Sequence, residues 1–100
     1  MQKIDIQELE WDHVNEQHIW EKHHISRIDV EEVCYGDPAN MLIEEAHNGR
    51  YRVIGPRHNG KILVVILSAK GEGRYYPVTA KQTRRQELRR YNTWKAGNEQ

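Results

Sequence analysis

The sequence predicts an α+β fold with two N-terminal helices, a four-stranded antiparallel meander and a C-terminal helix. Three observations lead to it: two helix-start signals before residue 30, apolar segments divided by Asn-Gly pairs over residues 41–79, and a polar segment with helical spacing after them. Strands that follow one another along the chain form a meander, and helices cover it. We interpret residues 1–100 as a single domain, with a core over 11–91 and a frayed tail over 95–100.

The N-terminal segment leads into the first helix. Over residues 1–10, Ile4 and Ile6 alternate with polar residues, which favours an arm or a short strand. Asp12 suits the N-cap position, because its carboxylate can accept hydrogen bonds from the free N–H groups of a first turn. We expect this helix to run to about His23.

A second helix begins with a stronger signal. Ser26 and Asp29 have the spacing of a capping box, and Ile25 and Val30 stand where a hydrophobic staple forms. Gly36 is expected to end the helix in the left-handed conformation that glycine adopts most easily. The inner face is predicted to hold Val30, Val33 and Cys34.

Four strands are predicted in the middle of the chain. Two Asn-Gly pairs, at 48–49 and 59–60, suit hairpin turns because such turns need positive φ. Ile62–Leu67 is apolar at six consecutive positions, so we expect a central strand covered on both faces. The four expected strands are Met41–Ala46, Arg50–Gly55, Ile62–Leu67 and Arg74–Thr79.

The last helix is expected from about Ala80 or Arg84 to near Trp94, with Leu88 and Tyr91 facing the core. Cations at Arg84 and Arg85 in a first turn oppose the helix dipole, so helix stability does not explain them. Anion binding would explain them, and so would pairing with carboxylates elsewhere in the chain.

Charge is divided between the two halves of the chain. Residues 1–46 hold three Lys/Arg and twelve Asp/Glu (3 − 12 = −9), and residues 47–100 hold twelve Lys/Arg and three Glu (12 − 3 = +9). Such segregation can build a basic face for phosphates. It can equally reflect acidic helices that pack on basic strands and pair with them. Both interpretations remain open at this point.

Several classes of protein are disfavoured by composition. Cys34 is the only cysteine, so no intrachain disulfide can form and a reducing cytoplasm is expected. The N-terminus lacks the features of a signal peptide, and no apolar run could span a bilayer. His18 and His23 are five residues apart, which does not suit two ligands on one helix face, so we expect no metal and no cofactor. Cys34 is interpreted as a buried apolar residue.

What remains is a basic and aromatic cluster suited to RNA. Arginine and lysine bind phosphates, and tyrosine offers a stacking surface for an unpaired base. Arg50 and Arg52 should share one strand face, while Tyr51 and Val53 share the other. The predicted RNA-binding residues are Arg50, Arg57, Arg74, Arg84 and Arg85.

Cleavage of RNA requires a base for the 2′-hydroxyl, cations for the charged phosphorane and an acid for the leaving oxygen. His, Lys, Tyr and Arg supply these functions without a metal. Lys22 and His23 are the titratable candidates nearest to the basic half. They also suit an ordinary helix C-terminus, where cations are favourable.

Three segments, in order, resemble the BrnT-type toxins. These are WDxxNxxHIxxKHxI over residues 11–25, GRYRVIGPxxxGKILVVIL over 49–67 and YPVTAKQTRRQELRRY over 76–91. The resemblance implies a RelE/ParE-like ribonuclease toxin of a bacterial type II toxin–antitoxin system. It implies a metal-independent endoribonuclease that inhibits translation, a cognate antitoxin as partner, and a homodimer or a toxin–antitoxin heterotetramer.

Carried over position by position, the resemblance points to the catalytic residues His23, Lys22, Arg52, Lys81 and Tyr76. Tyr76 and Lys81 stand where the family often has arginine, and lysine lacks the planar fork that binds phosphate in a bidentate manner. One alternative is a non-catalytic or decayed RNA- or protein-binding module of the same fold. Another is a purely structural, ion-paired domain, which predicts no cluster of exposed arginines.

Overall fold

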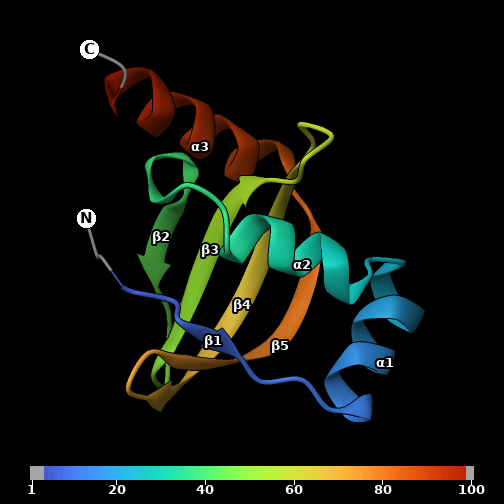
Figure 1. The fold of residues 1–100 in the computed structure, drawn as a ribbon. Coiled ribbons are helices and arrows are strands. Elements are labelled where there is room, and N and C mark those ends of the chain that lie inside the picture. The colour runs from blue at the N-terminus through green and yellow to red at the C-terminus, as the bar shows by residue number, and fades with distance from the viewer. Residues whose placement is uncertain (1–3, 99–100) are drawn as a thin grey trace.

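The structure, a computed structural model, describes residues 4–98. A single five-stranded sheet has the strand order β1-β5-β4-β3-β2, with helices on both faces (Figure 1). The strands are β1 (Glu8–Leu9), β2 (Leu42–Glu45), β3 (Arg50–Pro56), β4 (Ile62–Gly71) and β5 (Arg74–Gln82). The helices are α1 (His13–His23), α2 (Arg27–Cys34), the short 3₁₀ helix η1 (Pro38–Asn40) and α3 (Arg85–Asn98).

The α+β class and the meander of β2 to β5 are confirmed, but the sheet is mixed and has a fifth strand. β1 pairs with β5 in parallel, with Glu8 opposite Arg74 and Leu9 opposite Tyr75. The backbone N–H of Leu9 also donates to the Tyr35 hydroxyl at 2.8 Å, and the Leu9 side chain is buried. Of the segment 1–10, for which an arm or a short strand was predicted, Glu8–Leu9 is strand and the described residues before it are not, while residues 1–3 lie outside the described residues. These two residues are enough to change the sheet from antiparallel to mixed.

Both predicted helix starts are present as capping boxes. Asp12 accepts from the backbone N–H of Asn15, whose side chain accepts from the Asp12 N–H, and Ser26 and Asp29 form the same pair of bonds for α2. The prediction that Gly36 ends α2 in the left-handed conformation is wrong. The C-cap of α2 is Tyr35, with negative φ, and Gly36 does not have positive φ. The left-handed residue lies instead at the end of α1, where His24 has φ 55°.

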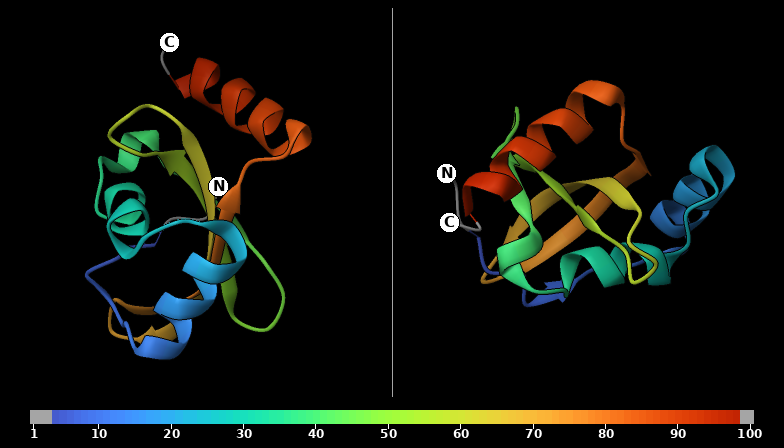
Figure 2. Two further views of the ribbon diagram at one scale, coloured as in Figure 1. Left: turned by 90° about the vertical axis from the view of Figure 1, so that its right-hand side faces the viewer. Right: turned by 90° about the horizontal axis from the view of Figure 1, so that it is seen from above.

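The two faces of the sheet carry different helices (Figure 2). α2 covers one face, α3 crosses the other over β2 and β3, and α1 packs against β5 at the edge of the sheet. β4 is the middle strand of the sheet, as predicted, and it is covered on both faces, since Val65 lies in the larger core and Val64 in the smaller one. The larger core, under α1 and α2, includes Ile19, Ile25, Val30, Val53 and Val65. The smaller core, under α3, includes Leu42, Ile54, Val64 and Tyr91, with Trp94 packed against it.

The last helix differs from its prediction at both ends. β5 continues to Gln82, so the helix begins at Arg85, and residues 95–98 are helical where a frayed tail was expected. Residues 99–100 lie outside the described residues. Tyr91 faces the core and its hydroxyl donates to the Asn40 carbonyl at 2.8 Å, but Leu88 is 37 % exposed. The inward position in the first turn is taken by Glu87, one residue earlier.

None of the helices among residues 4–98 combines the length and the apolar character needed to cross a membrane.

Candidate functional site

Two of the predicted catalytic residues, Arg52 and Lys81, lie on the face of the sheet that α3 partly covers. The strand register sets Arg52 opposite Ile66, and Lys81 opposite Val64. Alternation along each strand then places Ile66 and Val64 on one face together with both cations. Tyr51 and Val53 pack into the larger core on the other face, as predicted from the sequence.

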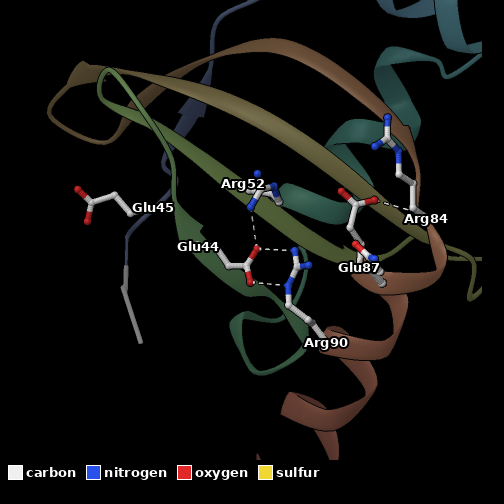
Figure 3. Close-up of a pocket in the computed structure, with 7 residues that line it drawn as sticks. Glu44, Glu45, Arg52, Arg84, Glu87 and Arg90 are labelled. Carbon is white, nitrogen blue, oxygen red and sulfur yellow. Dashed lines mark hydrogen bonds and ion pairs between the residues drawn. The ribbon is translucent and has the colours of Figure 1, made fainter.

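Arg52 belongs to a three-residue charge cluster with Glu44 and Arg90. The Glu44 carboxylate accepts from Arg52 Nη1 at 3.0 Å and from Arg90 Nε and Nη2, each at 3.0 Å (Figure 3). Partial burial alone would raise the pKa of Glu44, but the hydrogen bonds and charges of Arg90 and Arg52 outweigh it and hold that pKa below its ordinary value. One carboxylate thus fixes two guanidinium groups side by side, with a net charge of +1.

Glu87 organises the neighbouring cations at the start of α3. Its carboxylate accepts from the backbone N–H of Arg84 at 2.8 Å and lies 3.7 Å from Lys81 Nζ. Glu87 is 8 % exposed. An acidic side chain in the first turn also complements the helix dipole, which Arg84 and Arg85 oppose. The Glu87 carboxylate therefore binds both the backbone of the turn between β5 and α3 and the ammonium group of Lys81.

His23 reaches this area from the end of α1. Burial lowers the pKa of His23, and the positive charges of His18, Lys81 and Lys22 lower it further. The charge of Lys81 acts on His23 because α1 packs along β5. Both effects favour the neutral imidazole, the form that can accept a proton. Lys22, beside it in the last turn of α1, is exposed.

An open pocket of about 430 Å³ lies between β2, β3 and the first turns of α3 (Figure 3). Its charged lining is balanced, because three arginines face three glutamates (3 − 3 = 0): Arg52, Arg84, Arg90, Glu44, Glu45 and Glu87. The surplus of positive charge lies on α3 and the residue before it, where residues 84–98 hold five Lys/Arg and one Glu (5 − 1 = +4).

The structure supports each of the two interpretations of the charge segregation in part. In the described part of the chain, five pairs join the acidic half to the basic half, including Arg52–Glu44 and Arg74–Glu10. Yet among residues 4–98 four exposed arginines form no ion pair, namely Arg50, Arg84, Arg85 and Arg89. Three of these lie at the start of α3, so the purely structural alternative, which predicted no exposed arginine cluster, is wrong.

Two predicted RNA-binding residues are not brought to this site. Arg57 pairs with Asp29 of α2 at 3.7 Å, on the opposite face of the sheet, and its side chain is only 12 % exposed. Arg74 lies at the far end of β5, where it pairs with Glu10 at 3.1 Å and donates to the Lys70 carbonyl. Each is occupied in joining segments that are distant in the sequence.

Tyr76 is also separated from Lys81. Its hydroxyl lies 3.2 Å from both carboxylate oxygens of Asp12, at the start of α1, and the Lys70 ammonium lies 5.6 Å from its ring centroid. Burial raises the pKa of Tyr76, and the hydrogen bond to Asp12 and the Asp12 charge raise it further. His23 lies at the other end of α1, roughly 16 Å from Asp12 at a rise of 1.5 Å per residue.

Glu44 and Arg90 were missed by the sequence analysis as site residues. Glu44 follows the apolar residues Leu42 and Ile43 in β2, and only the register of β2 against β3 sets it opposite Arg52. Arg90 is 46 residues from Glu44, so no local pattern connects them. The available signal was a charged residue at an inward position of a strand.

Other chemistry finds little support in the described part of the chain. Residues 4–98 contain no group of three His, Cys, Asp or Glu side chains placed to hold a metal ion. Cys34 is buried, as predicted, and burial raises the pKa of its thiol strongly. A thiol in that state is a poor nucleophile.

Comparison with solved structures relates this fold to a known toxin. The chain is similar to the crystal structure of the Brucella abortus ribonuclease toxin BrnT, with a TM-score of 0.63 and 18 % sequence identity over 78 % of this chain and 97 % of that one. The fold is therefore BrnT-like. The wider RelE/ParE relationship stays a prediction. No protein-family model and no curated protein sequence matches the chain.

Proposed function

We propose that this chain is the toxin of a bacterial type II toxin–antitoxin system and acts as a metal-independent endoribonuclease in the cytoplasm, where it inhibits translation. The observation that carries the proposal is the BrnT-like fold, which spans nearly the whole of the Brucella ribonuclease toxin. The charge of Lys81, which helps to lower the pKa of His23, supports the proposal chemically, because His23 can then serve as a base and Lys81 as a cation. A cognate antitoxin is the expected protein partner, and a RelE/ParE-like origin fits the same proposal.

The proposed reaction is attack of a ribose 2′-hydroxyl on the adjacent phosphorus. Neutral His23 takes the 2′-hydroxyl proton, the P–O5′ bond breaks, and the Lys22 ammonium gives a proton to the leaving 5′-oxygen. Lys81 and Arg52 stabilise the negative charge that accumulates on the phosphorane oxygens. The exposed arginines at 84 and 85 bind neighbouring phosphates.

The test is growth after induced expression of the wild type beside the double variant Lys81→Ala, Arg52→Ala. The matched control removes two exposed cations elsewhere, Arg27→Ala and Lys61→Ala. We expect arrest with the wild type and the control, and growth with the double variant. In parallel, purified wild type is incubated with total RNA in the presence of EDTA. Intact RNA together with continued growth in all three strains would contradict the proposal.

A second candidate is a non-catalytic module of the same fold that binds RNA or a protein. The observation that favours it is the neutralisation of the two central cations, because Arg52 is held by Glu44 and Lys81 by Glu87. Charge reversal at Arg50 and Arg52 separates the candidates. In a binding module it abolishes complex formation, and the wild type hydrolyses nothing.

A further inference from the structure

Beside the charged pocket lies a second hollow of a different character. A groove of about 460 Å³ runs between β2 and the middle of α3, and Leu42, Glu44, Arg89, Arg90, Thr93 and Trp94 line it. Leu42 belongs to the smaller core and Trp94 packs against it. Its volume is in the range of pockets that hold small ligands or side chains, roughly 300–1,000 Å³.

The groove combines an apolar floor with a basic rim. Leu42 and Trp94 supply apolar surface, while Arg89 lines the groove, is exposed and forms no ion pair among residues 4–98. Arg90 also lines the groove, but it pairs with Glu44. An acidic polypeptide with an apolar side chain complements both parts at once. A sugar–phosphate backbone would satisfy the arginines but would leave the apolar floor uncovered. A base could stack on Trp94, but the aliphatic Leu42 and the edge strand β2 beside it suit an extended polypeptide better than RNA.

The neighbouring strand offers backbone groups to such a segment. β2 is the last strand of the sheet and pairs only with β3 in the described part of the chain. The Ala46 N–H donates to the Arg50 carbonyl, so by the alternation of an antiparallel ladder the backbone groups of Ile43 and Glu45 point away from β3. An extended segment can pair with these groups and place an apolar side chain in the groove.

We propose that the groove between β2 and α3 docks an acidic segment of a partner protein that carries an apolar anchor residue. Glu44 and Arg90 line both this groove and the charged pocket, so the two hollows adjoin across this ion pair. A segment seated in the groove therefore covers the approach to Arg52 and excludes RNA from it. This exclusion rests on the proposed function, whereas docking itself does not.

The experiment starts from a library of short random peptides displayed on phage and selected on the wild-type protein. The enriched peptide is synthesised with a fluorophore, and its affinity is measured by anisotropy against wild type, Thr93→Glu and Arg89→Glu. Both sites are exposed, so the fold is retained. We expect enriched sequences with Asp/Glu around an aliphatic or aromatic residue, and affinity at least about tenfold weaker for both variants. Arg27→Glu, a reversal on the opposite face, should change affinity less than about twofold.

The proposal is overturned if the enriched peptides lack acidic residues, or if they bind the two groove variants as tightly as the wild type. It is also overturned if Thr93→Glu weakens binding of a labelled single-stranded RNA while peptide affinity stays unchanged. Competition between the peptide and that RNA tests exclusion separately. RNA cleavage is measured on the same variants, so loss of docking with intact cleavage leaves the proposed function standing.

Discussion

Replacement of Glu44 by glutamine tests the charge cluster that holds Arg52. The substitution keeps the size of the side chain but removes the charge that three hydrogen bonds share. Hydrogen bonds to charged groups contribute roughly 1.5–3 kcal/mol when buried. Arg52 and Arg90 are 34 % and 44 % exposed, so solvent screens the interaction. We therefore expect a loss of about 1–2 kcal/mol, or roughly 4–16 °C in Tm for a domain of this size.

The pH dependence has a definite sign. The pKa of Glu44 is lowered in the folded state from an ordinary value of 4.5, so its stabilising effect is complete above that value and is lost as the pH falls through the folded pKa. Thermal unfolding followed by circular dichroism should show the full difference between wild type and Glu44→Gln at pH 7, and a smaller one in acid.

Glu45→Gln is the matched control, because the adjacent side chain is exposed and forms no ion pair among the described residues. Its effect should stay within about 0.5 kcal/mol. If both glutamine variants melt alike at pH 7, or if the effect of Glu44→Gln does not shrink in acid, the cluster does not stabilise the fold as described.

Three further variants or probes test separate contacts. Tyr76→Phe should lower the urea midpoint only slightly and leave RNA cleavage within about twofold, because among the described residues the lost hydroxyl bonds only the exposed carboxylate of Asp12; a cleavage defect larger than tenfold would return Tyr76 to the catalytic centre. Native Cys34 should not react with Ellman's reagent until urea unfolds the protein, and a fast native reaction would show that the thiol is accessible. In calorimetry, Gly73→Ala should lose about 1 kcal/mol or more of stability beyond Gly49→Ala, because both glycines have positive φ but only a Cβ at position 73 meets the Gln7 side chain, at 2.8 Å. Equal losses would mean that the contact with the N-terminal segment is unimportant.

The elements of this fold could be predicted because each depends on neighbouring residues. Local sequence was enough to predict three features, and all three were confirmed: the helix caps at Asp12 and Ser26 and the central strand at Ile62–Leu67. The parallel pairing of Leu9 with Tyr75 could not be predicted, because it joins residues 66 positions apart through backbone bonds that any side chain permits.

The site was less predictable for the same reason. Arg52 and Lys81 were found by composition and resemblance, and alternation placed them on one face. Arg57 and Arg74 have the same chemistry, but carboxylates contributed by α2 and by the N-terminal segment bind them elsewhere. Glu87 takes the inward position of α3 that was predicted for Leu88, because its carboxylate accepts from the Arg84 N–H and lies beside Lys81, contacts that the apolar pattern does not reveal.

The small core under α3 has a consequence for dynamics. The smaller core, the Glu44–Arg90 pair and the Tyr91–Asn40 hydrogen bond hold α3 in place, and this core has fewer buried apolar residues than the larger core that covers β4 on the other face. Hydrogen exchange in the native state should therefore be faster for the amides of α3 than for those of β4, since sub-global opening begins where the fewest apolar contacts are broken. The charged pocket depends on α3 being packed on the sheet, since opening of α3 would carry three of its lining residues away: Arg84, Glu87 and Arg90. A partner that holds α3 down would stabilise the pocket's shape even while it blocks the pocket.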